Sequence, residues 1–183
     1  MKIHLGCGKR YLSGFIHIDI ANFPHIDHVS SVESLPFIEN DSADEIYTSH
    51  TFEYFDRLDA PIVLKEWNRI LKKGGKLYLT VPDFENLIRI YSDSGKLENI
   101  IGPLFGRWIN SNLVSPLYHK TVWDRNDLTK YLLNAGFSKI HDFDPKIYLS
   151  QIDESYDDYS LAFFPHFNSS GTQVSLALVA EKI

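Results

Sequence analysis

Short apolar runs that stop at turn residues open the chain. Ile3 and Leu5 begin a short apolar run that stops at a glycine turn over residues 6–8, and a second run over residues 15–18 stops at Asp19. Residues 44–48, which end just before Ser49 and His50, are read as a third buried strand. Such runs are typical of buried strands. The pattern therefore predicts three strands, and the few residues between the first two leave room for one helical turn at most.

A helical pattern follows over residues 56–71. Its apolar positions mostly recur at helical spacing: Leu58, Ile62, Leu64, Trp67, Ile70 and Leu71. Pro61 falls in the first turn, where proline is tolerated, and we expect the glycine pair at 74–75 to end the helix with a left-handed cap. Alternating apolar residues over 77–81 predict the next strand. A strand, a helix and a strand in this order predict a parallel α/β sheet.

The composition suits a single domain, residues 1–183, and argues against some partners. The hydrophobic fraction is 44%, and a chain of this length buries roughly 70% of its unfolded surface. The net charge is −6, and without a run of Lys or Arg we expect no nucleic-acid binding. Cys7 is the single cysteine, which excludes a disulfide within the chain. No leader precedes the first strand, so we expect a cytoplasmic protein without membrane contact.

The glycine turn and the acid that ends the second strand are typical of a nucleotide-binding α/β unit. Gly6 and Gly8 let the backbone turn tightly and let a ligand approach it. Asp19 can accept hydrogen bonds from both ribose hydroxyls of an adenosine. A dinucleotide-binding unit would carry a third glycine, but the next one here is Gly14. The alternative is that the two glycines only form a tight turn.

His25 and His28 have a spacing that suggests a metal site. They lie in a polar stretch with a proline just before them, where the two rings would not share a face, and no third ligand is evident. We therefore expect a solvated loop and no metal.

Several strings, in their order and spacing, resemble the class I S-adenosylmethionine-dependent methyltransferases, in their small type-11-like branch with a shortened first crossover. They are HLGCG, GFIHIDI, VESLPF, SADEIYTSHTFEY, EWNRILKKGGKLYLTVPD and LTKYLLNAGF. The resemblance covers residues 2–83 and 119–143. It implies an α/β, Rossmann-like, doubly wound and mostly parallel seven-stranded sheet, with an antiparallel strand near the C-terminus. It also implies S-adenosylmethionine as cofactor.

The resemblance implies a role for each part of the site. The glycine turn would pass under the methionine part of the cofactor, Asp19 would bind the ribose, and the backbone of Val32 would meet the adenine edge. Ser49 and His50 would lie under the sulfonium and face the substrate. The cofactor-binding residues implied in this way are Gly6, Cys7, Gly8, Asp19, Ile20, Val32, Leu35, Ser49 and His50.

Three positions depart from the family pattern. His4 stands where the family often has an aspartate, and Ser31 stands where it often has an acid that reaches the adenine amino group. Arg10 occupies the third glycine position. We interpret these departures as variation within a branch that has a shortened first turn.

The second half of the chain should set substrate choice. Residues 84–123 and 145–171 are longer than the core fold needs, and both would emerge at the carboxyl edge of the sheet, so we predict that they form a lid. Residues 124–133 read as a helix with its first residue as N-cap. Strands six and seven are expected at 139–143 and 174–180.

Two stretches within the predicted lid each allow two interpretations. The acidic, aromatic residues 153–159 read as a solvated loop, with a surface for sugars or cationic groups as the alternative. The aromatic residues 163–167 would either pack on the lid or form the contact of a homodimer.

A methyl acceptor with a hydroxyl group needs a base, and histidine suits this role near neutral pH. By position His50 is the first candidate for the catalytic base and His119 the second. The alternative for His119 is a hydrogen-bonded loop histidine. We expect methyl transfer to a hydroxyl or amine of a small molecule or glycan.

Two other classes of protein compete with this interpretation. The first is a non-catalytic binding module that keeps the methyltransferase fold. The second is a reductase or epimerase, which the missing third glycine and the lack of a Tyr-x-x-x-Lys pair disfavour.

Overall fold

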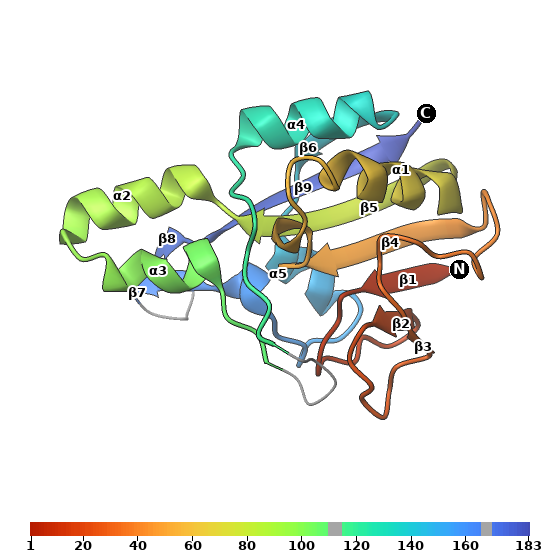
Figure 1. Cartoon of the computed structure of the whole chain (residues 1–183), viewed down its shortest axis with the longest axis horizontal. Helices are drawn as coiled ribbons and strands as arrows, with labels where there is room; N and C mark the ends of the chain where they lie inside the picture. The colour runs from red at the N-terminus through yellow and green to blue at the C-terminus, as the bar shows by residue number, and fades with distance from the viewer. Residues whose placement is uncertain (110–114, 166–169) are drawn as a thin grey trace.

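A seven-stranded sheet runs through the molecule (Figure 1), as seen in a computed structural model that describes residues 1–109, 115–165 and 170–183. Across the sheet the strands are β3 (His28–Val29), β2 (Ile16–Asp19), β1 (Lys2–Leu5), β4 (Ala43–Ser49), β5 (Leu71–Pro82), β9 (Ser175–Lys182) and β6 (Phe137–Asp142). The pairings from β3 to β5 are parallel, whereas β9 is antiparallel to both of its neighbours. The predicted fold class, with its antiparallel strand near the C-terminus, is confirmed.

One face of the sheet packs against two helices, α1 (Ala60–Ile70) and α4 (Arg125–Asn134). The strands present apolar residues in register to this face, such as Ile3, Ile46 and Leu77. As predicted, α4 follows Asp124, whose side chain accepts the backbone N–H of Asp127 at 2.8 Å. This core holds the parallel strands in place, so their carboxyl ends form a fixed edge.

The predicted end of α1 is wrong. The helix ends at Ile70, and Leu71 is already extended and pairs with Ala43 as the first residue of β5. The expected glycine cap at 74–75 therefore lies inside a strand. Leu71 is fully buried, and its carbonyl accepts a hydrogen bond from the Lys182 ammonium at 2.8 Å. Burial of this residue and its strand pairing therefore outweigh the capping preference of the glycines.

The opposite face of the sheet carries aromatic and histidine side chains instead of a crossover helix. His17, His4, Tyr47 and Tyr78 lie in register on four neighbouring strands. The ring centres of His4 and His17 are 5.6 Å apart, and those of His4 and Tyr47 are 5.3 Å apart. As predicted, residues 6–15 form turns and no helix. We call this row of four side chains the aromatic layer.

Residues from the C-terminal part of the chain cover the aromatic layer. Helix α5 (Pro145–Ser150) lies on this face (Figure 1), and its Tyr148 stacks on Tyr78 at 4.2 Å between ring centres. Leu149 and Tyr156 are buried in the same cluster. The N-terminal half of the sheet therefore depends on distant residues for its cover.

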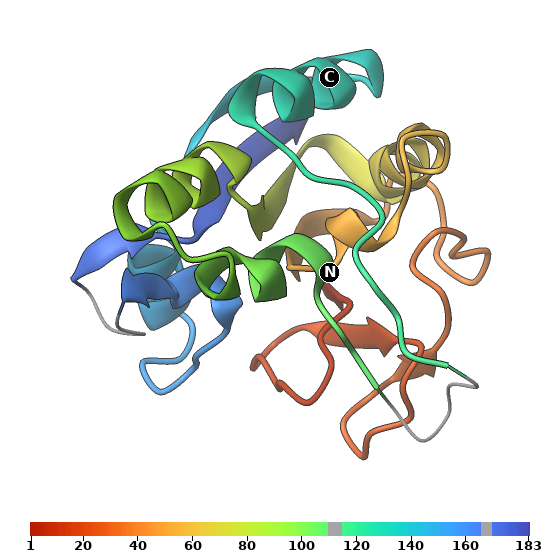
Figure 2. The ribbon, with the colours of Figure 1, turned by 60° about the vertical axis from the view of Figure 1, so that its left-hand side comes forward.

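The remaining elements form a layer at one end of the sheet (Figure 2). Helices α2 (Phe84–Ser94) and α3 (Glu98–Phe105) pack with a two-stranded sheet, β7 (Phe163–Pro165) and β8 (Gly171–Gln173). Phe164 packs on this cluster, and Phe167 and His166 lie outside the described residues. Within the described ranges, no helix is both long and apolar enough to cross a membrane.

Candidate functional site

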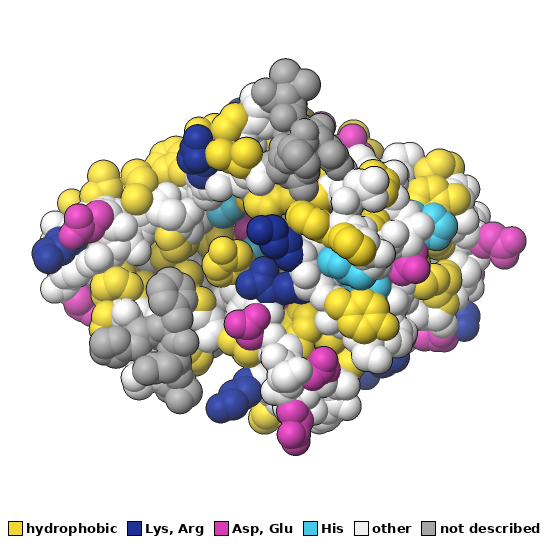
Figure 3. Space-filling model, turned by 90° about the horizontal axis from the view of Figure 1, so that it is seen from below, with side chains coloured by type: hydrophobic (Ala, Val, Ile, Leu, Met, Phe, Trp, Pro, Cys, Tyr) yellow, Lys and Arg dark blue, Asp and Glu magenta, His cyan; other side chains and the backbone are white. Residues whose placement is uncertain are grey.

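A cavity of about 520 Å³ lies at the carboxyl ends of β1, β2 and β4. Its size is that of a pocket for a small molecule or cofactor, and its place matches the rule that open α/β sheets bind ligands at this edge. The face seen in Figure 3 is hollowed near its centre, and Lys and Arg side chains border the hollow.

Most of the predicted cofactor residues meet in this cavity. Those that line it are Gly6, Cys7, Gly8, Asp19, Ile20, Val32, Ser49 and His50. Leu35 and His119 are not among the lining residues: Leu35 is fully buried in the core, and its N–H donates to Glu66 at 2.6 Å. Cys7 is buried, and this burial raises the pKa of its thiol to about 12, so the thiol stays protonated near neutral pH.

Asp19 is held in place by two backbone donors. Its two oxygens accept the N–H of Gly8 and the N–H of Ala21, each at 2.7 Å. Asp19 is 4% exposed, and burial raises the pKa of its carboxyl group above the ordinary value. Each oxygen keeps a second lone pair. The glycine turn thus orients an acid that can still accept hydrogen bonds from a ligand.

The two glycines of the turn have left-handed backbones but differ in the space around them. A Cβ at Gly6 would lie 2.1 Å from the Thr51 hydroxyl oxygen, whereas a Cβ at Gly8 would meet nothing within 4 Å. We expect Gly8→Ala to lower the free energy of unfolding by about 1–2 kcal/mol, the left-handed backbone cost. For Gly6→Ala we expect about 1–3 kcal/mol more, because the new methyl group overpacks the site. Urea unfolding of both variants measures this difference, and equal losses would contradict it.

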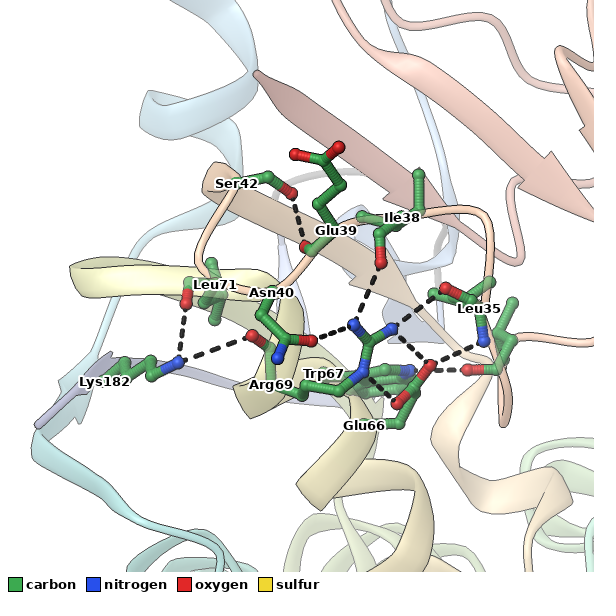
Figure 4. Close-up of polar contacts among 11 residues, drawn as sticks. Leu35, Ile38, Glu39, Asn40, Ser42, Glu66, Trp67, Arg69, Leu71 and Lys182 are labelled. Atoms are coloured by element: carbon green, nitrogen blue, oxygen red, sulfur yellow. Dashed lines mark hydrogen bonds and ion pairs between the residues drawn. The ribbon is translucent and has the colours of Figure 1, made fainter.

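A network on α1 fixes the loop that carries Val32 (Figure 4). Trp67 donates its indole N–H to the Val32 carbonyl at 2.9 Å. The Arg69 guanidinium donates to the carbonyls of Leu35 and Ile38, each at 2.9 Å. Among the described residues, the Val32 N–H has no hydrogen-bond partner. The loop therefore presents a free backbone donor beside the cavity.

The departures from the family pattern have structural reasons. His4 belongs to the aromatic layer, is 1% exposed, and burial lowers its pKa well below the ordinary value, so it is neutral. Its Nδ1 has no hydrogen-bond partner. Arg10 donates to the Asp157 carbonyl at 2.6 Å and lies 5.1 Å from the ring centre of Tyr159. Arg10 therefore connects the glycine turn to residues 157–159. His4, Arg10 and Ser31 all line the cavity.

The expectation of a solvated loop at 153–159 is wrong for two of its residues. Tyr156 is 9% exposed and Asp158 is 8% exposed, and both line the cavity. Asp158 accepts the Tyr47 hydroxyl at 2.6 Å, which anchors the segment on the aromatic layer. Sequence reasoning could not find this contact, because an acidic stretch of this kind is usually exposed.

His25 and His28 lie in the loop and the short edge strand beside β2. His28 is exposed, and the His25 ring centre is 5.5 Å from that of His17. Across the described ranges, no group of three or more His, Cys, Asp or Glu side chains is arranged to hold a metal ion.

His50 and His119 meet at one buried carboxyl group, that of Glu53, which lies on the short helix η1 (Phe52–Tyr54). The Glu53 Oε1 is 3.4 Å from the His50 Nδ1 and 3.7 Å from the His119 Nε2. His119 lies behind the cavity wall and bonds through Nδ1 to the Pro103 carbonyl at 2.9 Å, which favours the loop-histidine alternative for it. Glu53 was missed because an acidic residue is usually exposed, and the aromatic residues beside it in the sequence do not show that it is buried.

Both long segments of the second half contribute to the cavity wall. Trp108 and Leu117, which face each other as a bridged pair between α3 and α4, line it together with Tyr118 and Lys120. Figure 2 shows this part of the chain running out from α3 and returning toward α4. Tyr159 lines it from the other segment. Residues 110–114 and 166–169 of these segments lie outside the described residues.

Comparisons with known proteins agree on the fold and the domain. Residues 4–79 match the family model of a methyltransferase domain, and comparison with curated proteins gives no match. An S-adenosylmethionine-dependent methyltransferase and possible histamine N-methyltransferase from Thermotoga maritima is 18% identical, with a TM-score of 0.58, over 100% of this chain and 82% of that one.

Two archaeal S-adenosylmethionine-dependent methyltransferases are similar in the same way. The protein from Methanosarcina mazei is 14% identical with a TM-score of 0.59, over 100% of this chain and 92% of that one. The protein from Archaeoglobus fulgidus is 15% identical with a TM-score of 0.56, over 99% of this chain and 85% of that one. Residues 4–79 thus match a methyltransferase domain, and the whole chain shares the fold of these S-adenosylmethionine-dependent methyltransferases.

Proposed function

We propose that the chain methylates a hydroxyl or amine group of a small molecule or glycan, and that acceptor and cofactor share the 520 Å³ cavity. The observation that carries this proposal is the meeting of three parts in one cavity. These parts are the glycine turn with Asp19, the end of β4 with His50, and the aromatic walls from the two long segments.

The residues present fit S-adenosylmethionine. Space is open above Gly8, where a Cβ would meet nothing within 4 Å. The Val32 N–H and the Asp19 lone pairs are a donor and acceptors beside the cavity. Asp19 would accept the ribose hydroxyls, Val32 would meet the adenine edge, and the backbone at Gly6 and Gly8 would lie against the methionine part. The cofactor supplies a methyl group that is already activated on a sulfonium.

The chain's own residues then bind, orient and exclude water. Positioning of the acceptor in line with the methyl group can supply a large part of the rate enhancement of such a displacement. Tyr54, Trp108 and Tyr159 offer flat apolar surfaces for an acceptor, and we propose that the segments carrying Trp108 and Tyr159 act as the lid. His50, at the end of β4, is our candidate for the base that receives the acceptor's proton.

Cofactor binding can be tested by thermal unfolding with S-adenosylhomocysteine, S-adenosylmethionine, NAD and ATP, each at about a hundredfold over a plausible dissociation constant for a cofactor. A ligand that binds the native state at this excess adds about 2.7 kcal/mol of stability. For a domain of this size we expect the unfolding temperature to rise by roughly 5–10 °C with the two adenosyl sulfur compounds. NAD and ATP serve as controls and should have little effect. An unchanged unfolding temperature with all four would contradict the proposed function.

A further inference from the structure

Glu53 is a buried acid whose nearest charged partners are two histidines. The residue is 1% exposed, and neither carboxyl oxygen has a hydrogen-bond partner. No lysine or arginine of the described chain lies within ion-pair distance of it, and its Oε1 faces the His50 Nδ1 and the His119 Nε2. A buried carboxylate without a cation or a donor is strongly unfavourable. Only these two rings can share a proton with the Glu53 carboxyl group.

The outer nitrogen of each ring is fixed by a neighbour. The His119 Nδ1 lies 2.9 Å from the Pro103 carbonyl, which can only accept, so this nitrogen carries a proton. The His50 Nε2 lies 2.7 Å from the Ser175 hydroxyl oxygen, and that hydroxyl donates to the Tyr159 carbonyl at 3.0 Å. Since the serine proton is used there, the His50 Nε2 also carries a proton.

The two inner nitrogens would then have no proton if both rings were neutral. The His50 Nδ1, the His119 Nε2 and an ionised Glu53 would present three lone pairs to one another inside the protein. One additional proton replaces this repulsion by a charge-assisted hydrogen bond. We propose that His50, Glu53 and His119 hold one proton in common, and that Glu53 is the positioning residue that sets the protonation of His50 in the cavity wall.

A serine, a histidine and an acid in this order also suggest a nucleophile with its base. Ser175, however, is 3% exposed and is not among the residues that line the cavity. No substrate can reach it, so an acyl-transfer reaction gains no support. Ser175 and Glu53 instead lie behind His50, which itself lines the cavity. This inference deepens the proposed function, on which it rests: His50 can receive the acceptor's proton only while the shared proton lies on Glu53 or His119.

The other groups around the cluster do not supply the missing proton. The Tyr54 ring packs edge-on against His119 at 4.8 Å, and burial together with the Glu53 carboxylate raises the pKa of its phenol. The Tyr159 ring centre is 5.8 Å from that of His50. Lys120 reaches Glu53 through its backbone, whose N–H donates to the Glu53 carbonyl at 2.8 Å. The shared proton therefore stays within the three side chains.

The proton can be counted by NMR on the full chain, without cofactor or acceptor. Histidine ¹⁵N shifts report which ring nitrogens carry protons, and the carboxyl ¹³C shift of Glu53 reports whether it is ionised. At pH 7 we expect protons on the His50 Nε2 and the His119 Nδ1, and one further proton shared among the inner nitrogens and the carboxyl group. In Glu53→Gln the amide keeps the shape, both rings become neutral, and the shared proton is lost. Glu154→Gln, an exposed acid of the C-terminal segment, is the control and should leave both rings unchanged.

Two results would overturn the proposal: neutral rings beside an ionised Glu53 in the wild type, or identical ring protonation in wild type and Glu53→Gln. If Glu53→Gln does not fold, the wild-type proton count still decides between these outcomes. The count is independent of ligands, so a failed thermal shift with S-adenosylhomocysteine would remove the proposed function and leave the cluster standing. A normal thermal shift with no shared proton would support the proposed function and remove the proposed proton sharing.

Discussion

Replacing Asp19 with alanine should weaken binding of S-adenosylhomocysteine by about 1.5–3 kcal/mol, the scale of hydrogen bonds to a charged group. This corresponds to a dissociation constant roughly 10–150-fold higher. The physical reason is twofold. The substitution removes the acceptors for the ribose hydroxyls, and it frees the N–H groups of Gly8 and Ala21 that the carboxylate now holds at 2.7 Å. The glycine turn would thus lose its orientation together with its ligand contact.

Isothermal titration calorimetry on the folded variant measures this loss. Asp19→Asn is a useful second variant, because it keeps the shape but turns one acceptor into a donor that faces a backbone N–H. Asp44→Ala is the matched control, because Asp44 is an exposed acid that pairs with Lys72 away from the cavity. Wild-type affinity in Asp19→Ala would show that the ribose assignment is wrong.

Replacing Trp67 with alanine should lower the free energy of unfolding by about 3–5 kcal/mol, the usual cost of removing a large buried aromatic side chain. Trp67 is fully buried, and its ring centre lies 5.6 Å from that of Phe52. The substitution leaves a cavity between α1 and the sheet. It also leaves the Val32 carbonyl without its indole donor, so the loop beside the cavity should loosen as well.

Urea unfolding of the wild type and Trp67→Ala gives this value when both curves are fitted with the same dependence of the unfolding free energy on urea concentration. Trp67→Phe should cost less, because it keeps the ring contact and loses the hydrogen bond. Trp108→Ala is the control, since Trp108 is partly exposed on the cavity wall and its loss should change stability little. A loss below about 1 kcal/mol in Trp67→Ala would mean that the core collapses around the missing ring.

The sequence predicted the elements that follow from local pattern. The first two strands, the turn between them and the position of Asp19 are as expected, because apolar runs and turn residues act over a few neighbours. The N-cap at Asp124 is also local and is confirmed. The lid function of residues 84–123 and 145–171 stays a prediction.

Long-range contacts could not be predicted in this way. Helix α3 contains Gly102 and Pro103, which argue against a helix when the segment is read alone. The end of α1 is set by strand pairing of Leu71 with Ala43. Glu53 and His119 come together because the segment after α3 returns to η1, and no local pattern of residues encodes that return. Tyr156 and Asp158 are buried for the same reason.

The aromatic layer also has a consequence for how the chain folds. Its cover comes from the far end of the sequence: the Tyr47 hydroxyl donates to Asp158, 111 residues away, and Tyr148 donates to Glu45, 103 residues away. Contacts of such sequence separation form late and slow the folding reaction. A nascent chain that has emerged only to the end of β5 has the cofactor residues but one bare face of the sheet. Its cofactor half should therefore stay unfolded on the ribosome until residues 145–158 have emerged.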